Sequence, residues 1–152
     1  MTKLRSNILA LALLVAAAPL HAGGPVNVAG ASQIAVSGYD PVAFFTDGKA
    51  LTGTPSITTV HDGATYLFAS EEHRKLFLKD PVRYLPQYGG FCAFGAAKGG
   101  LFPVDISTWQ VRDGKLYLNF SKDVLARFNA AFDEQVTKAD KNWPGLVERY
   151  SK

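Results

Sequence analysis

The residues best suited to chemistry are one cysteine, Cys92, and two histidines, His61 and His73. Cys92 lies in the segment Gly-Gly-Phe-Cys-Ala-Phe-Gly, whose small residues leave room for another group beside the sulfur. One thiolate and two imidazoles would be three of the four ligands of a closed zinc site, so a carboxylate, a water or a second protomer would complete it. Copper(I) prefers soft sulfur ligands, which a single cysteine supplies poorly. The sequence therefore predicts a small binding module with a transition-metal site, for copper or zinc, around Cys92.

Two other interpretations of Cys92 stay open. An exposed thiol that ionises readily would react with peroxide or with a partner thiol, which makes a thiol redox protein the second hypothesis. A cysteine buried among aromatic side chains would instead belong to a structural or partner-binding domain without chemistry. The sequence has no nucleophile elbow, no phosphate-binding glycine loop and no helix with paired histidines, so it favours a binding protein over an enzyme and indicates no catalytic residue.

Further pocket candidates flank the turns of the chain. His73 is expected in the first turn of a helix, where the positive end of the helix dipole favours a neutral imidazole that can bind a metal; its simpler interpretation is a packing or capping histidine. His61 precedes an Asp-Gly turn, where a solvated residue is the simpler interpretation. Tyr39, Asp40 and Tyr88 also lie beside turns and could reach a shared pocket, although packing aromatics and a turn-forming aspartate are simpler interpretations.

Two helices are expected to position these residues. Ser70 is a good N-cap with two glutamates behind it, and the helix that it starts should stop near Asp80, before a proline. A second helix should start at Ser121. Its apolar residues recur every four positions, which predicts one amphipathic helix lying on a core, and they are Val124, Phe128, Phe132 and Val136.

Strand signals alternate with these helices. Residues 33–37 form a short strand candidate, and residues 56–60 and 64–68 flank an Asp-Gly turn, a strong hairpin signal. A second hairpin is expected from residues 109–111 and 115–120 around another Asp-Gly pair. Strand pairs and helices follow one another without repeated strand-helix-strand units. The predicted fold class is therefore α+β, a small antiparallel sheet built from two hairpins with helices packed on it.

The N-terminal residues predict export. A basic start with Lys3 and Arg5 is followed by an apolar run over residues 8–18 and small residues near Ala22, which describes a cleaved secretory signal peptide over residues 1–22. Residues 23–32 are predicted to be a flexible lead-in, and residues 33–152 a single domain. The expected location is periplasmic or secreted, with no stable membrane insertion after cleavage of the signal.

The charge balance restricts the class of partner. The net charge of +3 falls to +1 once Lys3 and Arg5 leave with the signal, and the remaining basic residues are interleaved with acids. This pattern lacks the basic patch of a nucleic-acid-binding protein. The expected partners are a metal ion or another periplasmic protein.

Four segments carry a family likeness. They are Gly-Tyr-Asp-Pro-Val-Ala-Phe-Phe at residues 38–45, Tyr-Leu-Phe-Ala-Ser at residues 66–70, Gln-Tyr-Gly-Gly-Phe-Cys-Ala-Phe-Gly at residues 87–95, and Asn-Trp-Pro at residues 142–144. These segments resemble exported bacterial YHS-domain proteins, the branch labelled YHS domain-containing (seleno)protein. The resemblance covers nearly the whole predicted mature chain and implies one YHS-like domain over residues 33–152.

The resemblance also implies what the site contains. Some YHS domains bind metals through cysteines, and the matching positions here are Ala43, Ala69 and His73. The resemblance therefore implies that the thiol-rich form of the site is largely absent from this chain. A selenocysteine at the position of Cys92 in the related selenoproteins would imply a reactive chalcogen there.

Overall fold

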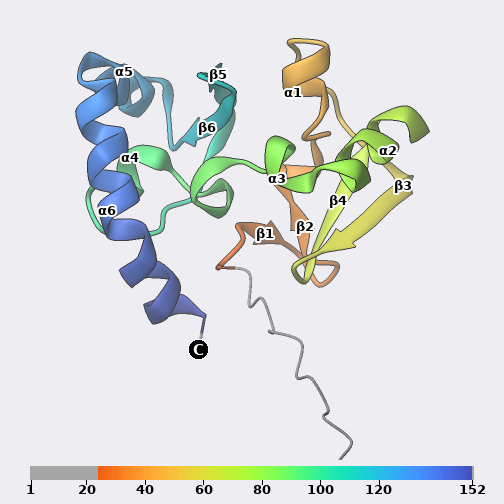
Figure 1. Cartoon of the computed structure of the whole chain (residues 1–152), viewed down its shortest axis with the longest axis horizontal. Coiled ribbons are helices and arrows are strands. Elements are labelled where there is room, and N and C mark those ends of the chain that lie inside the picture. Colours follow the sequence, from red (N-terminus) through yellow and green to blue (C-terminus); the bar gives the residue numbers. More distant parts are fainter. Residues whose placement is uncertain (1–23, 152) are drawn as a thin grey trace, which may run out of the picture.

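The computed structural model describes residues 24–151, so the predicted signal peptide, residues 1–22, lies outside the described residues. The described chain contains short strands, two single 3₁₀ turns and helices of 4 to 19 residues (Figure 1). In chain order the elements are β1 (Val28–Ala29), β2 (Ile34–Ala35), η1 (Val36–Gly38), α1 (Ala43–Thr46), β3 (Thr54–His61), β4 (Ala64–Phe68), α2 (Glu71–Lys79), α3 (Pro81–Tyr84), η2 (Gln87–Gly90), α4 (Ala93–Ala97), β5 (Asp105–Arg112), β6 (Lys115–Asn119), α5 (Lys122–Ala130) and α6 (Phe132–Tyr150).

The fold class is α+β, as the sequence predicts. Both expected hairpins are present, but they lie in separate sheets. The β3–β4 hairpin belongs to a four-stranded sheet of order β1-β2-β4-β3, in which β2 and β4 run parallel, whereas β5 and β6 pair only with each other. Figure 1 shows α1, α2 and α3 around the first sheet and α4, α5 and α6 beside the second. The single predicted sheet is therefore two sheets, each with its own helices.

Both hairpin turns have the geometry that Asp-Gly pairs favour. Asp62 and Gly63 have φ angles of 48° and 77°, and Asp113 and Gly114 have φ angles of 52° and 70°. Two successive residues with positive φ match the right-handed twist of the flanking strands, and aspartate and glycine adopt this backbone at little cost. The two predicted turns are confirmed.

The predicted helix starts are also confirmed. The side-chain oxygen of Ser70 accepts a hydrogen bond from the N–H of His73, and that of Ser121 accepts one from the N–H of Val124. Helix α2 ends before Asp80, as predicted. The helix after Ser121, however, is not continuous, because Ala131 takes a non-helical conformation with φ −143° and ψ 51° and divides it into α5 and α6.

Two local expectations near the N-terminus are wrong. The predicted lead-in contains β1, which pairs with β2, and the N–H of Asn27 donates to the carbonyl of Gly89 at 2.8 Å. The strand expected over residues 33–37 stops at Ala35, since Val36 and Ser37 have φ angles of 52° and 53°. Valine rarely adopts positive φ, and burial of the Val36 side chain at 4 % exposure holds the turn in place.

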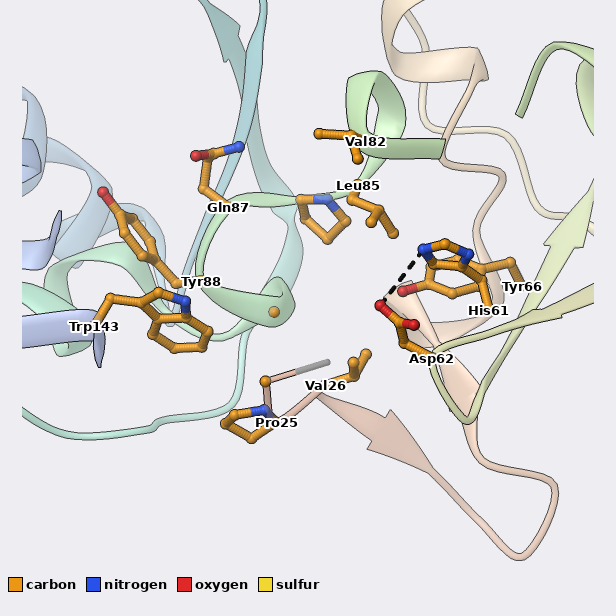
Figure 2. A pocket seen from close by; sticks show the side chains of 13 residues that line it. Pro25, Val26, His61, Asp62, Tyr66, Val82, Leu85, Gln87, Tyr88 and Trp143 are labelled. Carbon is orange, nitrogen blue, oxygen red and sulfur yellow. Dashed lines mark ion pairs between the residues drawn. The ribbon is translucent and has the colours of Figure 1, made fainter. Parts of the chain in front are cut away.

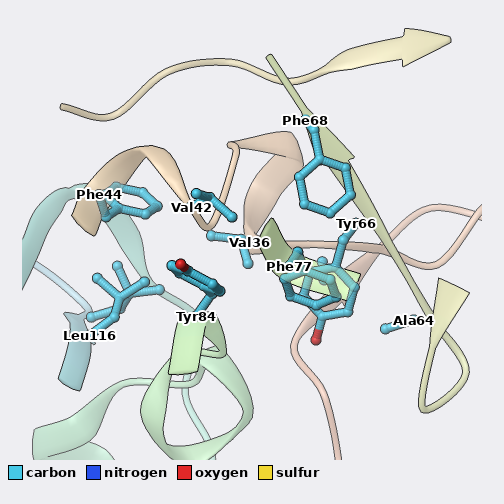
Figure 3. Close-up of a cluster of buried hydrophobic side chains, with 11 residues drawn as sticks. Val36, Val42, Phe44, Ala64, Tyr66, Phe68, Phe77, Tyr84 and Leu116 are labelled. Atoms are coloured by element: carbon cyan, nitrogen blue, oxygen red, sulfur yellow. The ribbon is translucent and has the colours of Figure 1, made fainter. Parts of the chain in front are cut away.

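Two hydrophobic cores meet on opposite faces of β6. Leu116 and Leu118 pack into the first core, with Phe68 and Phe77, whereas Tyr117 packs into the second core. Figure 3 shows the first core, where Leu116 lies near Tyr84 and Phe44. Burying a leucine or phenylalanine side chain contributes about 1.5–3 kcal/mol to the free energy of unfolding, so the side chains of β6 stabilise both hydrophobic cores.

The apolar residues Leu116, Leu118 and Phe120 alternate along the sequence, but the position of β6 between the cores gives a different burial pattern. A strand with one face in water would bury Phe120 and expose its odd-numbered neighbours. Instead, four successive residues of β6 are buried and Phe120 is 52 % exposed. Among residues 24–151, no helix has the length and apolar character needed to cross a membrane.

Candidate functional site

The three predicted metal ligands lie in different parts of the fold. His73 is on α2 beside Asp40, His61 ends β3 beside Asp62, and Cys92 is the N-cap of α4. Within residues 24–151, no group of three or more histidine, cysteine, aspartate or glutamate side chains is arranged to hold a metal ion. The metal site predicted around Cys92, with His73 and His61 as further ligands, is therefore not assembled in this structure.

Cys92 is held by neutral groups from two elements. Its sulfur accepts a hydrogen bond from the N–H of Gly95 at 3.3 Å, and its S–H faces Oδ1 of Asn119 at 3.7 Å. The residue is 2 % exposed. The chain is anchored there by the N–H of Cys92, which donates to the carbonyl of Phe102. This environment suits a small, largely apolar side chain with one accessible edge.

Asn119 is a site residue that the sequence analysis missed. It is fully buried at the end of β6, and its Oδ1 also accepts a hydrogen bond from the N–H of Phe94. Among the described residues its Nδ2 has no hydrogen-bond partner. An unpaired buried amide costs free energy, so a native structure usually has a reason to keep one. The one feature of the sequence that could have identified Asn119 is that it is a polar residue directly after the apolar residues of a predicted strand.

The glycines around Cys92 make room for a phenyl ring. A Cβ added to Gly95 would lie 2.6 Å from Cδ2 of Phe102, and one added to Gly100 would lie 2.7 Å from Cε2 of the same ring. The group that approaches Cys92 through its small neighbours is thus the side chain of Phe102. The glycine pattern near Cys92 reflects packing rather than a phosphate or metal cradle.

A hollow of about 380 Å³ opens above the sulfur of Cys92. Its walls are almost entirely apolar, and only Lys98 carries a charge; they consist of Phe94, Gly95, Lys98, Phe102, Phe120 and Val124. Phe102 and Phe120 are 50 % and 52 % exposed, so two aromatic side chains border the opening. A volume in the range of small-molecule sites, with apolar walls, is suited to an apolar ligand.

His73 belongs to a second, polar cluster. Its Nδ1 lies 2.6 Å from Oδ2 of Asp40, which is fully buried and also accepts from the N–H of Ala69 at 2.8 Å. The other oxygen of Asp40 accepts from the N–H groups of Val42 and Ala43. All these bonds join the start of α1 to the β4–α2 junction. Asp40 is thus a structural anchor whose carboxylate is already saturated with donors.

The outer nitrogen of His73 faces the end of α1. Its Nε2 lies 3.3 Å from Oδ2 of Asp47 and 3.4 Å from Oγ1 of Thr46. The sequence analysis treated Thr46 and Asp47 as part of a loop and missed both. Both nitrogens of the imidazole therefore lie beside a carboxylate. The ring is therefore held between α1 and α2 rather than presented as a metal ligand.

The remaining pocket candidates do not share one site. Tyr39 forms a bridge with Thr52 and packs on the first core, while Asp40 is enclosed beside His73. Tyr88 lies in the second core, where its hydroxyl donates to Asp140 at 2.9 Å. Burial first, and then this hydrogen bond, raises the pKa of Tyr88 well above its ordinary value. His61 packs edge-on against the ring of Phe77, with centroids 5.8 Å apart.

Comparison with known proteins adds no relative: no family model matches the sequence, and no curated protein or solved structure matches it either.

Proposed function

We propose that this chain is a small binding module whose site is the hollow above Cys92, and that the ligand is a small apolar molecule. The observation that carries the proposal is the combination of apolar walls, a volume of about 380 Å³ and the bordering side chains Phe102 and Phe120. Transfer of an apolar molecule from water to such walls is favourable by about 25 cal/mol per Å² of buried apolar surface. The sulfur of Cys92 contributes a polarizable contact to the wall of the hollow.

A transition metal at Cys92 does not fit the residues that surround it. The groups nearest to the sulfur are the N–H of Gly95 and the side-chain oxygen of Asn119. Copper(I) and zinc need further thiolate or imidazole ligands, and both histidines of the described chain are engaged elsewhere. A metal at Cys92 would therefore need ligands from a second molecule.

A thiol redox role is the second candidate. One observation favours it, namely that Cys92, although only 2 % exposed, is among the residues that line the hollow. Reaction with peroxide would convert the thiolate to a sulfenic acid, with water as the second product. Treatment with one equivalent of peroxide, followed by a sulfenic-acid-specific label and mass spectrometry, separates the two candidates. A redox thiol labels within minutes, whereas a thiol that only lines a binding hollow stays reduced.

Export and family membership are part of the same proposal. The basic and apolar N-terminal residues support a cleaved signal, and the segments at residues 38–45 and 87–95 support an exported YHS-domain protein. Fractionation of cells with intact-mass measurement tests the export. A periplasmic or secreted protein that begins near Gly23 supports it, and an uncleaved cytoplasmic protein contradicts it.

The binding proposal is tested with a neutral apolar probe. We expect N-phenyl-1-naphthylamine to bind saturably, with a rise in its fluorescence. Val124 lines the hollow, and Val124→Asp places a charge there, which should weaken binding by about tenfold or more because a buried unpaired charge is costly. Ala126→Asp adds the same charge at an exposed position of α5 and should leave binding unchanged.

Two results would overturn the binding proposal. One is the absence of saturable probe binding by the folded protein. The other is equal loss, or equal retention, of binding in Val124→Asp and Ala126→Asp, because the probe would then be elsewhere. Thermal melting of both variants shows whether a loss of binding reflects a loss of folding.

A further inference from the structure

A second cavity lies where the two halves of the molecule face each other. It has a volume of about 240 Å³ and is separate from the hollow above Cys92, with which it shares no residue. In Figure 2, His61, Asp62 and Tyr66 of the β3–β4 hairpin form one side, and Trp143 of α6 stands opposite. Val26 and Leu85 supply apolar contacts. We call this cavity the interface cleft.

The first observation is a buried polar group aimed into the interface cleft. Tyr66 is 2 % exposed, and its hydroxyl points toward the open space in Figure 2. Among the described residues this hydroxyl has no hydrogen-bond partner, and the pKa of Tyr66 is raised by burial and then by the charge of Asp62, without a contribution from any hydrogen bond. The phenol is thus a neutral donor with no hydrogen-bond partner among residues 24–151. Because Tyr66 lines the cleft, its hydroxyl can donate a hydrogen bond to a ligand there.

The second observation is the sign of the charge. The described lining of the interface cleft contains the carboxylate of Asp62 and no lysine or arginine. His61 lies beside this carboxylate, with Nε2 and Oδ2 separated by 3.5 Å, too far for a strong hydrogen bond. An anionic ligand would find no permanent positive charge here, whereas a cation would find one negative charge.

The third observation is the aromatic wall. The ring of Trp143 is braced by Tyr88, with an edge-on contact at a centroid distance of 5.8 Å. The hydroxyl of Tyr88 points away from the cleft toward Asp140, so Tyr88 supports the wall without adding a polar group to it. Indole is the best side chain for binding a cation through its π face.

We propose that the interface cleft binds a small organic cation, with its ammonium group between Asp62 and Trp143 and a hydrogen-bond acceptor on the hydroxyl of Tyr66. The volume of the cleft restricts the ligand to a few heavy atoms, of the size of choline. The ligand would contact both halves of the molecule, because the hairpin belongs to the first core and Trp143 packs on the second.

The test compares choline with its neutral isostere, 3,3-dimethylbutan-1-ol, and uses the protein as the cell produces it. The two probes have the same shape and hydroxyl, and they differ in charge alone. We expect choline to shift the indole N–H resonance of Trp143 saturably, and the resonance of Trp109 to stay unchanged because Trp109 packs on Phe44 in the first core. The neutral isostere should bind at least roughly fivefold more weakly.

The two Asp-Gly hairpins supply a matched pair of variants. Asp62→Asn removes the charge in the cleft and keeps a side chain that tolerates positive φ, so binding should weaken by roughly fivefold. Asp113→Asn makes the same change in the other hairpin, at φ 52°, and should leave binding unchanged. Tyr66→Phe removes only the hydroxyl and should weaken binding by roughly threefold.

Any one of three outcomes would overturn the inference. They are no choline binding below about 10 mM, binding of the neutral isostere as tight as that of choline, and equal choline binding by Asp62→Asn and Asp113→Asn. Each variant is conservative, and a melting curve for each one checks that it is folded. The result does not depend on the hollow above Cys92, since N-phenyl-1-naphthylamine binding is measured separately.

Discussion

The surroundings of His73 and of Cys92 differ in how completely their polar groups are paired. Asp40 beside His73 is fully buried and has four hydrogen-bond partners, three backbone N–H groups and one imidazole nitrogen. Beside Cys92, the Nδ2 of the buried Asn119 has no partner among the described residues, and the sulfur makes only long contacts. The polar groups of the first region are paired within the chain, whereas the second region borders an open apolar hollow.

The comparison separates a structural cluster from the proposed binding site. Judged by residue types alone, a cluster of one histidine and two aspartates resembles a functional centre more than a single cysteine does. The contacts reverse this order, because both oxygens of the Asp40 carboxylate are occupied by hydrogen bonds that join α1 to α2. The apolar hollow above Cys92 has walls that still face solvent.

The largest effect is expected from Asp40→Asn. The amide keeps one oxygen acceptor but turns a donor toward groups that donate, leaving buried N–H groups unpaired. We expect the free energy of unfolding to fall by about 3 kcal/mol or more, measured by urea denaturation. Asp47→Asn is the matched control, because Asp47 pairs with the other nitrogen of His73 but is 38 % exposed, and its loss should cost under about 1 kcal/mol.

Equal destabilisation by the two substitutions would contradict the view that Asp40 is the anchor. Probe binding at Cys92 provides a further check. Where folded, Asp40→Asn should bind N-phenyl-1-naphthylamine as the unmodified protein does, since the two regions share no contact among those described.

The second-largest effect on stability is expected at alkaline pH. The pKa of Tyr66 in the first core and of Tyr88 and Tyr117 in the second are all raised above the ordinary value of 10.0, mainly by burial. A raised pKa in the folded state means that the folded protein holds these protons longer than the unfolded chain does. The corresponding stability is complete below pH 10 and is lost as the pH rises above it.

Circular dichroism against pH tests this expectation. Tyr66→Phe and Tyr88→Phe should each move the alkaline unfolding transition to higher pH, because each removes a group that ionises on unfolding. Tyr150→Phe, at a residue that is 50 % exposed, should leave the transition where it is. A protein that unfolds at the same alkaline pH in all three variants would show that other groups control the transition.

A smaller effect is expected from Cys92→Ala. The thiol makes weak contacts, so its loss should lower the free energy of unfolding by about 1 kcal/mol, well below the cost of Asp40→Asn. The apolar probe should still bind within about threefold, because the phenyl walls remain. Loss of all probe binding in a folded Cys92→Ala variant would indicate that the sulfur, rather than the aromatic wall, holds the ligand.

The smallest effect is expected from Lys98→Ala. The ammonium of Lys98 lies 4.9 Å from the ring centroid of Phe94 at the edge of the hollow. Because the probe is neutral, removal of this charge should change its affinity by less than about twofold. A larger loss, measured by the same fluorescence titration, would mean that the hollow selects an anionic group.

Local chemistry made much of the fold predictable. The caps Ser70 and Ser121 and the two Asp-Gly turns act within a few residues of themselves, and all four were identified from sequence. Strand pairings between segments that are far apart in the sequence could not be predicted. The parallel pairing of β2 with β4 and the antiparallel pairing of β1 with β2 depend on the tertiary structure, which local sequence patterns do not reveal.

The candidate site was predictable from sequence in one residue, Cys92, but neither its apolar surroundings nor the partners of its side chains were. Cys92 was identified because it is the one thiol, but the contact of its sulfur with Asn119 depends on the position of β6 between two cores. The position of β6 between two cores also explains why its burial does not alternate. Alternation is expected only for a strand with one face exposed to solvent. His73 was placed correctly on its helix, whereas its partners Asp40 and Asp47 became visible only when α1 was positioned against α2.

Protection of Cys92 from alkylation tests the central claim most directly. Iodoacetamide is small and neutral, and we expect it to approach the buried sulfur from the hollow that the probe is proposed to fill. With N-phenyl-1-naphthylamine at about ten times its dissociation constant, only about one tenth of the sites are empty. The alkylation rate should therefore fall roughly tenfold. The Val124→Asp variant should show no protection. An unchanged alkylation rate at full probe occupancy would contradict the account, because the bound probe would then lie away from Cys92.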